Sequence, residues 1–326
     1  MDYFLYKLKF DGAVHFGQSD SAMSLYTAAD HFRADTLFSA LCHTALSLWG
    51  EQGLQELINQ ANADELLLSD SMPWRNNNGK DEYYLPKPCI IAEQKREVSP
   101  ELRKKIKKVA WIPVFRMGEF EDSLNGKTTY NPTDEPFGVA EERTSAAVFD
   151  HADTRPYQVG VYHFRPNCGL YILVGVKTKT QTERMKTLLT ALGLGGIGGK
   201  TSAGYGSFTL EKTIELSKAS DQQAKWFQKA LTGKNAKHYL LLTTSLPADD
   251  ELDQALEGAQ YQLVRRGGFV QSSAFSATPV KKQTQMFLSA GAMLTKPFAG
   301  ALYNVADGGT HAVIRYAKPM MLGVSF

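Results

Sequence analysis

The chain has 326 residues, enough for two domains that each bury a core. Its composition is that of an ordinary globular protein, and its formal net charge at pH 7 is only +2. This charge excludes a global basic field, so any binding of nucleic acid must come from local patches. The three cysteines, Cys42, Cys89 and Cys168, lack Cys-x-x-Cys spacing, which argues against zinc and indicates a reducing compartment.

No apolar run in the sequence reaches membrane-spanning length, and the first residues resemble a strand, not a signal peptide. We therefore expect a cytoplasmic protein without a membrane segment. We also expect no metal site and no cofactor.

The chain begins with a predicted strand over residues 3–10, in which apolar and polar side chains alternate. Its aromatic and leucine side chains share one face. Lys7 and Lys9 lie on the other face, which we expect to meet water or a ligand. A turn over residues 12–17 follows and carries His15 and Phe16.

A first helix is predicted from Asp35 to about Gly50, with a turn or two more over residues 53–59. A short strand follows at residues 66–68. From about residue 69 to 156 the periodicity weakens and prolines recur, which predicts an elaborated insertion without a separate core. Within it, Ser99-Pro100 caps a short basic helix whose cations form either a solvated face or an RNA contact. Residues 141–147, which are rich in small side chains, are predicted to form a loop.

Regular patterns return after the insertion. Residues 157–164 and 170–176 predict a hairpin, and the second of these strands is apolar throughout and therefore central. A helix over residues 185–192 and a strand over residues 207–214 complete the order β-α-β-β-α-β. This is the ferredoxin-like arrangement, which is also the RRM topology, and it predicts a first domain over residues 1–215.

Residues 216–326 predict a second, less regular ferredoxin-like domain, so the expected fold class is α+β with two such units. Its expected elements are a helix around Phe227, a strand at 238–245, a helix at 249–257, a hairpin of 261–266 with 269–275, and strands at 286–294, 313–316 and 320–324. The hairpin is expected to turn at Gly267-Gly268.

The most distinctive stretch is a glycine-rich loop over residues 193–206, with glycine at seven of fourteen positions. A Walker A loop is excluded because the pattern fails by one position. Gly193, Gly195 and Gly198 satisfy G-x-G-x-x-G, but here the loop follows a helix and precedes a strand, the reverse of a dinucleotide site. The loop is either a phosphate cradle built from backbone N–H groups or a long helix-terminating turn without a ligand.

Other candidates stand outside the loop. His15 is either an acid-base catalyst or a hydrogen-bonding residue at an RNA groove, and Phe16 is either core or contact. Arg33 precedes the first helix, whose positive N-terminus suits a phosphate, although a solvated loop is the alternative. Arg265 and Arg266 sit at the expected hairpin tip, where guanidinium groups either fork onto phosphate or form a salt bridge.

Several motifs resemble one protein family. They are Val14-His15-Phe16-Gly17, the stretch from Ala34 to Leu41, Arg143-Thr144-Ser145-Ala146, the stretch from Gly198 to Gly206, and Arg265-Arg266-Gly267-Gly268-Phe269. In order and spacing they are similar to the RAMP superfamily of CRISPR proteins, and within it to the family of fourth subunits of the type III-A Csm effector complex. The resemblance spans most of the chain.

The resemblance implies a subunit that caps the complex, holds the repeat-derived 5′ tag of the CRISPR RNA (crRNA), and is not a nuclease. It implies contacts with the large polymerase-like subunit and the backbone RAMP subunit. The loop would bind tag phosphates through its N–H groups, with Lys200 supplying charge. The candidate RNA-binding residues are His15, Phe16, Gly17, Arg33, Arg143, Thr144, Gly195, Gly196, Gly198, Gly199, Lys200, Thr201, Ser202, Gly204, Tyr205, Gly206, Arg265 and Arg266.

Two other functions compete with this expectation. An endoribonuclease that matures CRISPR RNA would use His15 as its acid or base. A nucleotide-binding enzyme would use the glycine-rich loop, although the flanks of the loop disfavour it. Membership of the related Cmr complex also stays open.

Overall fold

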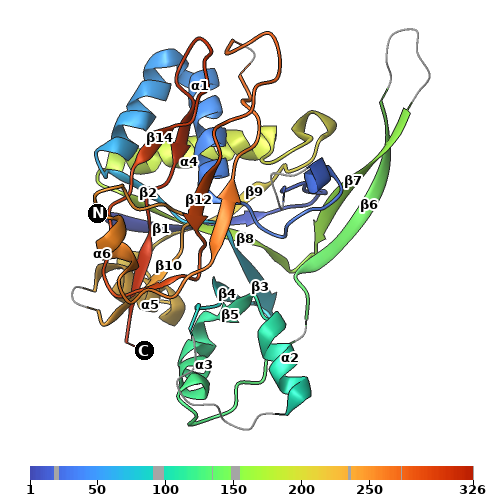
Figure 1. Ribbon diagram of the computed structural model, residues 1–326. Coiled ribbons are helices and arrows are strands. Elements are labelled where there is room, and N and C mark those ends of the chain that lie inside the picture. The colour runs from blue at the N-terminus through green and yellow to red at the C-terminus, as the bar shows by residue number, and fades with distance from the viewer. Residues whose placement is uncertain are drawn as a thin grey trace.

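A computed structural model describes residues 1–17, 22–90, 99–133, 135–147, 155–233, 236–272 and 274–325. The chain is a mixed α+β protein with several antiparallel sheets, as predicted at this coarse level (Figure 1). Within the described residues, no helix combines the length and the apolar character needed to cross a bilayer.

The largest sheet has seven strands, and all of its paired neighbours are antiparallel. These strands are β1 (Asp2–Lys9), β2 (Leu66–Leu68), β3 (Met72–Asn77), β4 (Lys80–Pro86), β5 (Trp111–Pro113), β8 (Cys168–Val176) and β9 (Thr209–Glu215). Their order is β5-β4-β3-β8-β1-β9, and β2 also pairs with β8. Every residue of β8 is buried, which confirms the prediction of a central strand.

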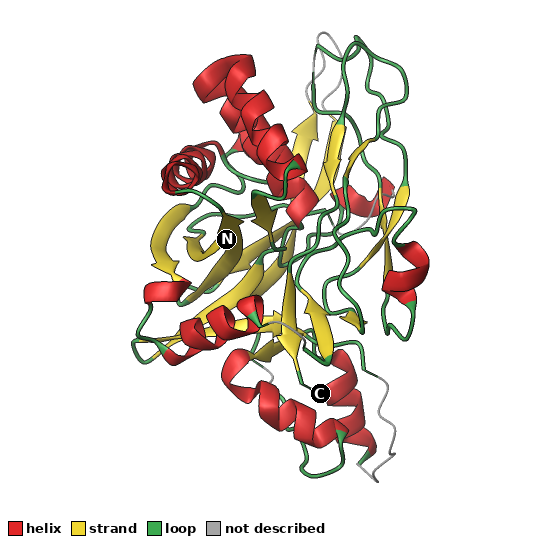
Figure 2. Cartoon of the chain, turned by 90° about the vertical axis from the view of Figure 1, so that its left-hand side faces the viewer, coloured by secondary structure: helices red, strands yellow, loops and turns green. Residues whose placement is uncertain are grey.

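Helices cover both faces of this sheet (Figure 2). The helices concerned are α1 (Ala34–Asn62), α4 (Lys179–Gly195) and α5 (Gln222–Thr232). One core cluster packs Tyr6 of β1 against α1 and α4, whereas a second cluster packs Leu5 against Phe227 of α5. Because side chains of a strand alternate between faces, β1 serves two cores at once.

The prediction that Lys7 faces water or a ligand is wrong. Lys7 is only 4% exposed, its amine lies 3.7 Å from the centre of the Trp74 ring, and it pairs with Asp81 at 2.8 Å. Trp74 of β3 and Asp81 of β4, both from the segment predicted as an insertion, cover this amine, and the ion pair stabilises the buried charge.

Helix α1 is longer than predicted. The expected end at Gly50 is a kink, where φ is +66°, and the helix then continues to Asn62. Glycine adopts this left-handed conformation without steric cost, so the sequence signal marked a bend in the helix.

The segment predicted as an insertion adds three strands, β3 to β5, to the main sheet. Its helices are α2 (Pro100–Lys108) and α3 (Met117–Leu124), at the lower end of the molecule in Figure 1. Helix α2 is the predicted basic helix, and Ser99 caps it by accepting the Leu102 N–H at 3.3 Å. Buried residues of this segment, among them Ile112 and Phe120, belong to the same core cluster as Leu5.

Two sequence predictions fail at a long two-stranded arm, formed by β6 (Gly138–Ala147) and β7 (Arg155–Phe164) (Figure 1). Residues 141–147 were expected to be a loop, but they pair with β7 along the whole strand. The predicted hairpin of β7 with β8 is therefore wrong. The turn between them is a corner at which the chain leaves the arm for the main sheet, and Arg165 N–H donates to Phe137 rather than to a β8 partner.

The second half contains the predicted helix α5 and short strands. Its other elements are β10 (His238–Leu241), α6 (Leu252–Leu256), β11 (Leu263–Arg266), β12 (Gln285–Leu288), β13 (Met293–Leu294), β14 (Leu302–Asn304), β15 (Ile314–Tyr316) and β16 (Met321–Val324). They form the sheets β13-β10-β16, β11-β12 and β14-β15. Short 3-10 segments in the chain cover Ala22–Leu25, Val114–Arg116, Thr201–Ala203 and Leu216–Lys218.

The predicted hairpin around Gly267-Gly268 is also wrong, because β11 pairs with β12. Arg315, which is 4% exposed, donates to the carbonyls of Arg266, Gly267 and Gln283 at 3.0 Å. These carbonyls bind a side chain and do not close a tight turn. Arg265 and Arg266 therefore lie at the end of a strand, not at a hairpin tip.

Candidate nucleic-acid interface

The glycine-rich loop joins the end of α4 to β9, as the sequence predicts. Helix α4 begins with a capping box at Thr178 and Gln181, and Ile197 anchors the loop by burying its side chain in the core. A short 3-10 segment, Thr201–Ala203, follows Lys200, whose φ is +61°.

The glycines of this loop are needed for contacts within the protein. A Cβ at Gly198 would lie 2.7 Å from the His15 carbonyl oxygen, and one at Gly206 would lie 2.0 Å from the Ile197 carbonyl oxygen. Both residues also have positive φ, which side chains disfavour. The loop thus packs tightly on the segment that follows β1.

Several backbone donors of the loop are used inside the protein. The N–H groups of Ile197, Gly199 and Gly206 donate to the carbonyls of Gly206, His15 and Ala13, at 3.0, 2.9 and 2.9 Å. In contrast, four N–H groups donate to no acceptor among the described residues. These belong to Gly198, Lys200, Thr201 and Ser202. Of the N–H groups expected to bind phosphate, those that already donate within the protein are therefore not available to a ligand.

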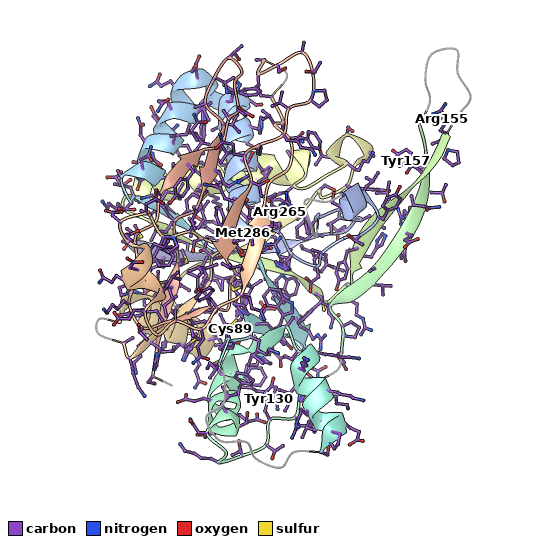
Figure 3. All side chains as sticks on the ribbon, in the orientation of Figure 1. Cys89, Tyr130, Arg155, Tyr157, Arg265 and Met286 are labelled. Carbon is purple, nitrogen blue, oxygen red and sulfur yellow. The ribbon has the colours of Figure 1, made fainter. Side chains whose placement is uncertain are left out.

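Lys200 connects the loop to the arm. Its amine donates to the Tyr157 hydroxyl at 2.9 Å and lies 4.7 Å from the centre of the same ring. The hydrogen bond from Lys200 lowers the pKa of Tyr157. Figure 3 shows Tyr157 and Arg155 on the arm.

His15 lies behind the loop. Its side chain is 6% exposed, and Nδ1 donates to the Gly160 carbonyl oxygen at 2.6 Å. Because a carbonyl only accepts, this bond places a proton on Nδ1. Phe16 is buried in the core beside Phe10 and Phe32, although part of it reaches the surface of a groove.

The start of α1 contacts the second half through a buried ion pair. Arg266 donates from Nε and Nη2 to the two Asp35 oxygens at 2.9 and 2.8 Å. Burial alone would raise the pKa of Asp35, but the charge and hydrogen bonds of Arg266 outweigh it and hold this pKa below its usual value. Of the two alternatives for Arg266, the structure shows the salt bridge.

A single groove of about 1010 Å³ runs between the loop, α1 and the second half. It brings together many of the predicted site residues, namely Phe16, Gly17, Arg33, Gly195, Gly196, Gly198, Gly199, Lys200, Thr201, Ser202 and Arg266. Its cationic side chains are Arg33, Lys200, Arg266, Lys282 and Arg315. Among its described lining residues, Asp35 is the only acid, and Arg266 already pairs with it.

Other predicted residues do not line this groove. They are His15, Arg143, Thr144, Gly204, Tyr205, Gly206 and Arg265. Arg143 lies on the arm and contacts His163 at 2.8 Å, while Thr144 bonds Gln158 across the strand pair. Arg265 is exposed on β11 next to Met286, as Figure 3 shows.

Among the groove residues that the sequence did not single out are His43, Phe269, Lys282 and Arg315. Phe269 belongs to a motif that was noted, but it was not assigned a role. A signal for His43 was present, since Thr36, Ser39, His43 and Ser47 recur at helical spacing and form the polar side of α1. Lys282 reaches the groove only through tertiary packing.

The sequence of the chain matches one class of CRISPR proteins. The model of the RAMP superfamily matches residues 7–209, a range that includes the last three residues of β1, the glycine-rich loop and the first residue of β9. The chain is therefore a RAMP superfamily protein. Residues 234–324 match a second model, the CRISPR Csm4 C-terminal domain.

Relatives place it more narrowly. The chain is 34% identical to the CRISPR system Cms protein Csm4 of Mycobacterium tuberculosis, over 98% of this chain and 97% of the relative. It is 30% identical to the protein of the same name from Streptococcus thermophilus, over 98% of both chains. The chain belongs to the Csm4 family.

Solved structures support the same fold. A chain of a Csm3-Csm4 subcomplex from a type III-A CRISPR-Cas interference complex matches with a TM-score of 0.65 at 17% identity, covering 100% of both chains. A chain of a Csm1-Csm4 cassette in complex with cA4 matches with a TM-score of 0.59 at 18% identity, over 100% of this chain and 98% of that one.

Proposed function

We propose that this chain is a non-catalytic, cytoplasmic RNA-binding subunit of the type III-A CRISPR interference complex, and that its groove holds the repeat-derived 5′ tag of the crRNA. The observation that carries the proposal is the charge of the groove. Five cationic side chains line it against one carboxylate, and that carboxylate is already paired. Such a surface suits a polyanionic strand despite the nearly neutral charge of the whole chain.

The glycine-rich loop would contribute backbone hydrogen-bond donors to RNA binding in addition to the charge of Lys200. Gly198, Lys200, Thr201 and Ser202, whose N–H groups have no acceptor in the described part of the chain, are close in sequence and line the same groove. Successive backbone donors of this kind suit a phosphate oxygen, and contacts to the phosphate backbone position an RNA without reading its sequence.

We also interpret the fold as two ferredoxin-like units. The first covers residues 1–215 and contains an insertion at about 69–156, and the second covers residues 216–326. The strand order β9-β1-β8-β2, with α1 and α4 as the two helices, fits the βαββαβ arrangement of the first unit. In the second unit, the order β16-β10-β13 fits three of the four strands. Between β13 and β16, where a second helix belongs, the chain forms the β14–β15 pair.

We propose two protein partners, the large polymerase-like subunit and the backbone RAMP subunit. The proposal follows from the similar solved chains, which come from a Csm1-Csm4 cassette and a Csm3-Csm4 subcomplex. Copurification of the chain with both subunits, and with an RNA of uniform 5′ end, is the expected result.

His15 is a poor candidate for a nuclease residue, because its side chain is buried and lies outside the lining of the groove. The test incubates the full chain with repeat RNA and analyses the products on a denaturing gel. We expect binding without cleavage. Site-specific cleavage that His15→Ala abolishes, and that the exposed control His311→Ala retains, would contradict the proposal.

A further inference from the structure

The second half contributes an exposed aromatic ring to the groove. Phe269 lines the groove and is 49% exposed. Among the described residues, the Lys281 amine lies 5.9 Å from the centre of this ring, and no aromatic side chain packs on it. A large apolar ring open to a polar groove is a common feature of surfaces that bind planar ligands.

The backbone around Phe269 is held on both sides. Phe269 forms a bridge with Lys281, and Lys282 N–H donates to the Gly268 carbonyl at 2.8 Å. On the preceding side, Arg315 binds the Gly267 carbonyl at 3.0 Å. The ring is thus presented by a fixed backbone, which lowers the entropy lost when a ligand binds.

Lys282 places a half-buried amine in the same groove. This amine makes no hydrogen bond or ion pair with any residue that the structure describes, and the nearby Asp35 is held by Arg266. Burial lowers the pKa of Lys282, whereas Asp35 opposes that shift. A half-buried cation without an acceptor is stabilised by an anion that enters the groove.

We propose that Phe269 and Lys282 form a nucleotide subsite for single-stranded RNA, in which an unpaired base stacks on the Phe269 ring and a phosphate of the same strand binds the Lys282 amine. The inference rests on the proposed function and deepens it. A base inside a duplex is paired and stacked on its neighbours, so the subsite selects single-stranded RNA.

The test measures fluorescence anisotropy of the full chain with a labelled single-stranded RNA that carries the repeat-derived tag sequence. A series of the same RNA replaces one base at a time with an abasic site. We expect Phe269→Ala to weaken binding about tenfold, and one abasic position to weaken binding to the unmodified protein by a similar factor. That abasic position should cause no further loss in Phe269→Ala, because the same stacking contact is already missing.

Three controls accompany these variants. Phe115→Ala removes another exposed ring outside the groove, and Phe269→Leu keeps an apolar side chain but removes the aromatic face. Lys282→Gln should reduce the salt dependence by about one phosphate contact. Thermal melting of each variant checks its folding.

The outcomes separate two failures. If the unmodified protein binds the single strand but no abasic position couples to Phe269, the subsite is wrong and the proposed function stands. The subsite is also wrong if the annealed duplex binds as tightly as the single strand. If the unmodified protein binds neither RNA, the proposed function and the subsite both fail.

Discussion

Asp70 accepts a hydrogen bond from the Thr244 hydroxyl at 2.6 Å, although 174 residues separate them in the chain. Its other oxygen accepts from the N–H groups of Ala34 and Thr244, at 2.8 and 3.0 Å. Asp70 is buried between the two halves of the chain. One carboxylate therefore fixes the start of α1 to the second half, and the groove lies between these same parts.

Replacing Asp70 should destabilise the whole fold. In Asp70→Ala, two backbone N–H groups and one hydroxyl lose their acceptor in the buried interior, and we expect the free energy of unfolding to fall by about 3 kcal/mol. Urea denaturation followed by circular dichroism measures this change.

A matched control removes an exposed aspartate. Asp11 makes no contact of this kind with any residue that the structure describes, so Asp11→Ala should change the free energy of unfolding by less than about 0.5 kcal/mol. Equal stability of Asp70→Ala and Asp11→Ala would show that the carboxylate does not hold the two halves together.

The local sequence pattern predicted individual helices and strands better than it predicted which strands pair with each other. The unbroken apolar run of β8 located the centre of the sheet, and Ser99 located the start of α2. The partner of β7, in contrast, is a strand rich in charged and small residues, and strand pairing depends on contacts distant in sequence. The buried position of Lys7 depends in the same way on Trp74 and Asp81, two residues distant in the sequence that the strand alone cannot specify.

The candidate site was predictable where its residues are contiguous. The high glycine content of residues 193–206 identified the loop. It did not show that Gly198 and Gly206 are needed for close packing of the loop against neighbouring backbone carbonyls of the same chain. Lys282 and Arg315 enter the groove from a distant part of the chain. No short sequence motif predicts such residues, because only the packing of the two halves brings them close to the loop.

Lys200 should contribute one phosphate contact to RNA binding. Lys200→Ala is expected to weaken binding modestly and to reduce the slope of log affinity against log salt concentration by about one. The contact with Tyr157 orients the amine, so Lys200→Arg should restore most of the salt dependence. Anisotropy titrations at several salt concentrations measure the slope.

The control for this prediction removes an equal charge elsewhere. Lys186 is exposed on α4 and does not line the groove, so Lys186→Ala should leave the slope unchanged. An identical slope for Lys200→Ala and the unmodified protein would exclude a phosphate contact at Lys200.

Two glycines of the loop should respond differently to alanine. A Cβ at Gly195 meets no atom within 4 Å, whereas a Cβ at Gly198 meets the His15 carbonyl at 2.7 Å where φ is +101°. Gly198→Ala should therefore lower the free energy of unfolding by about 1–3 kcal/mol, while Gly195→Ala, at the end of α4, should keep or slightly raise it. Because Gly195→Ala leaves the fold intact, any loss of RNA affinity in this variant reports how closely the strand approaches the backbone. Denaturation and anisotropy on the same samples separate the two effects, and equal destabilisation by both substitutions would contradict the packing role of Gly198.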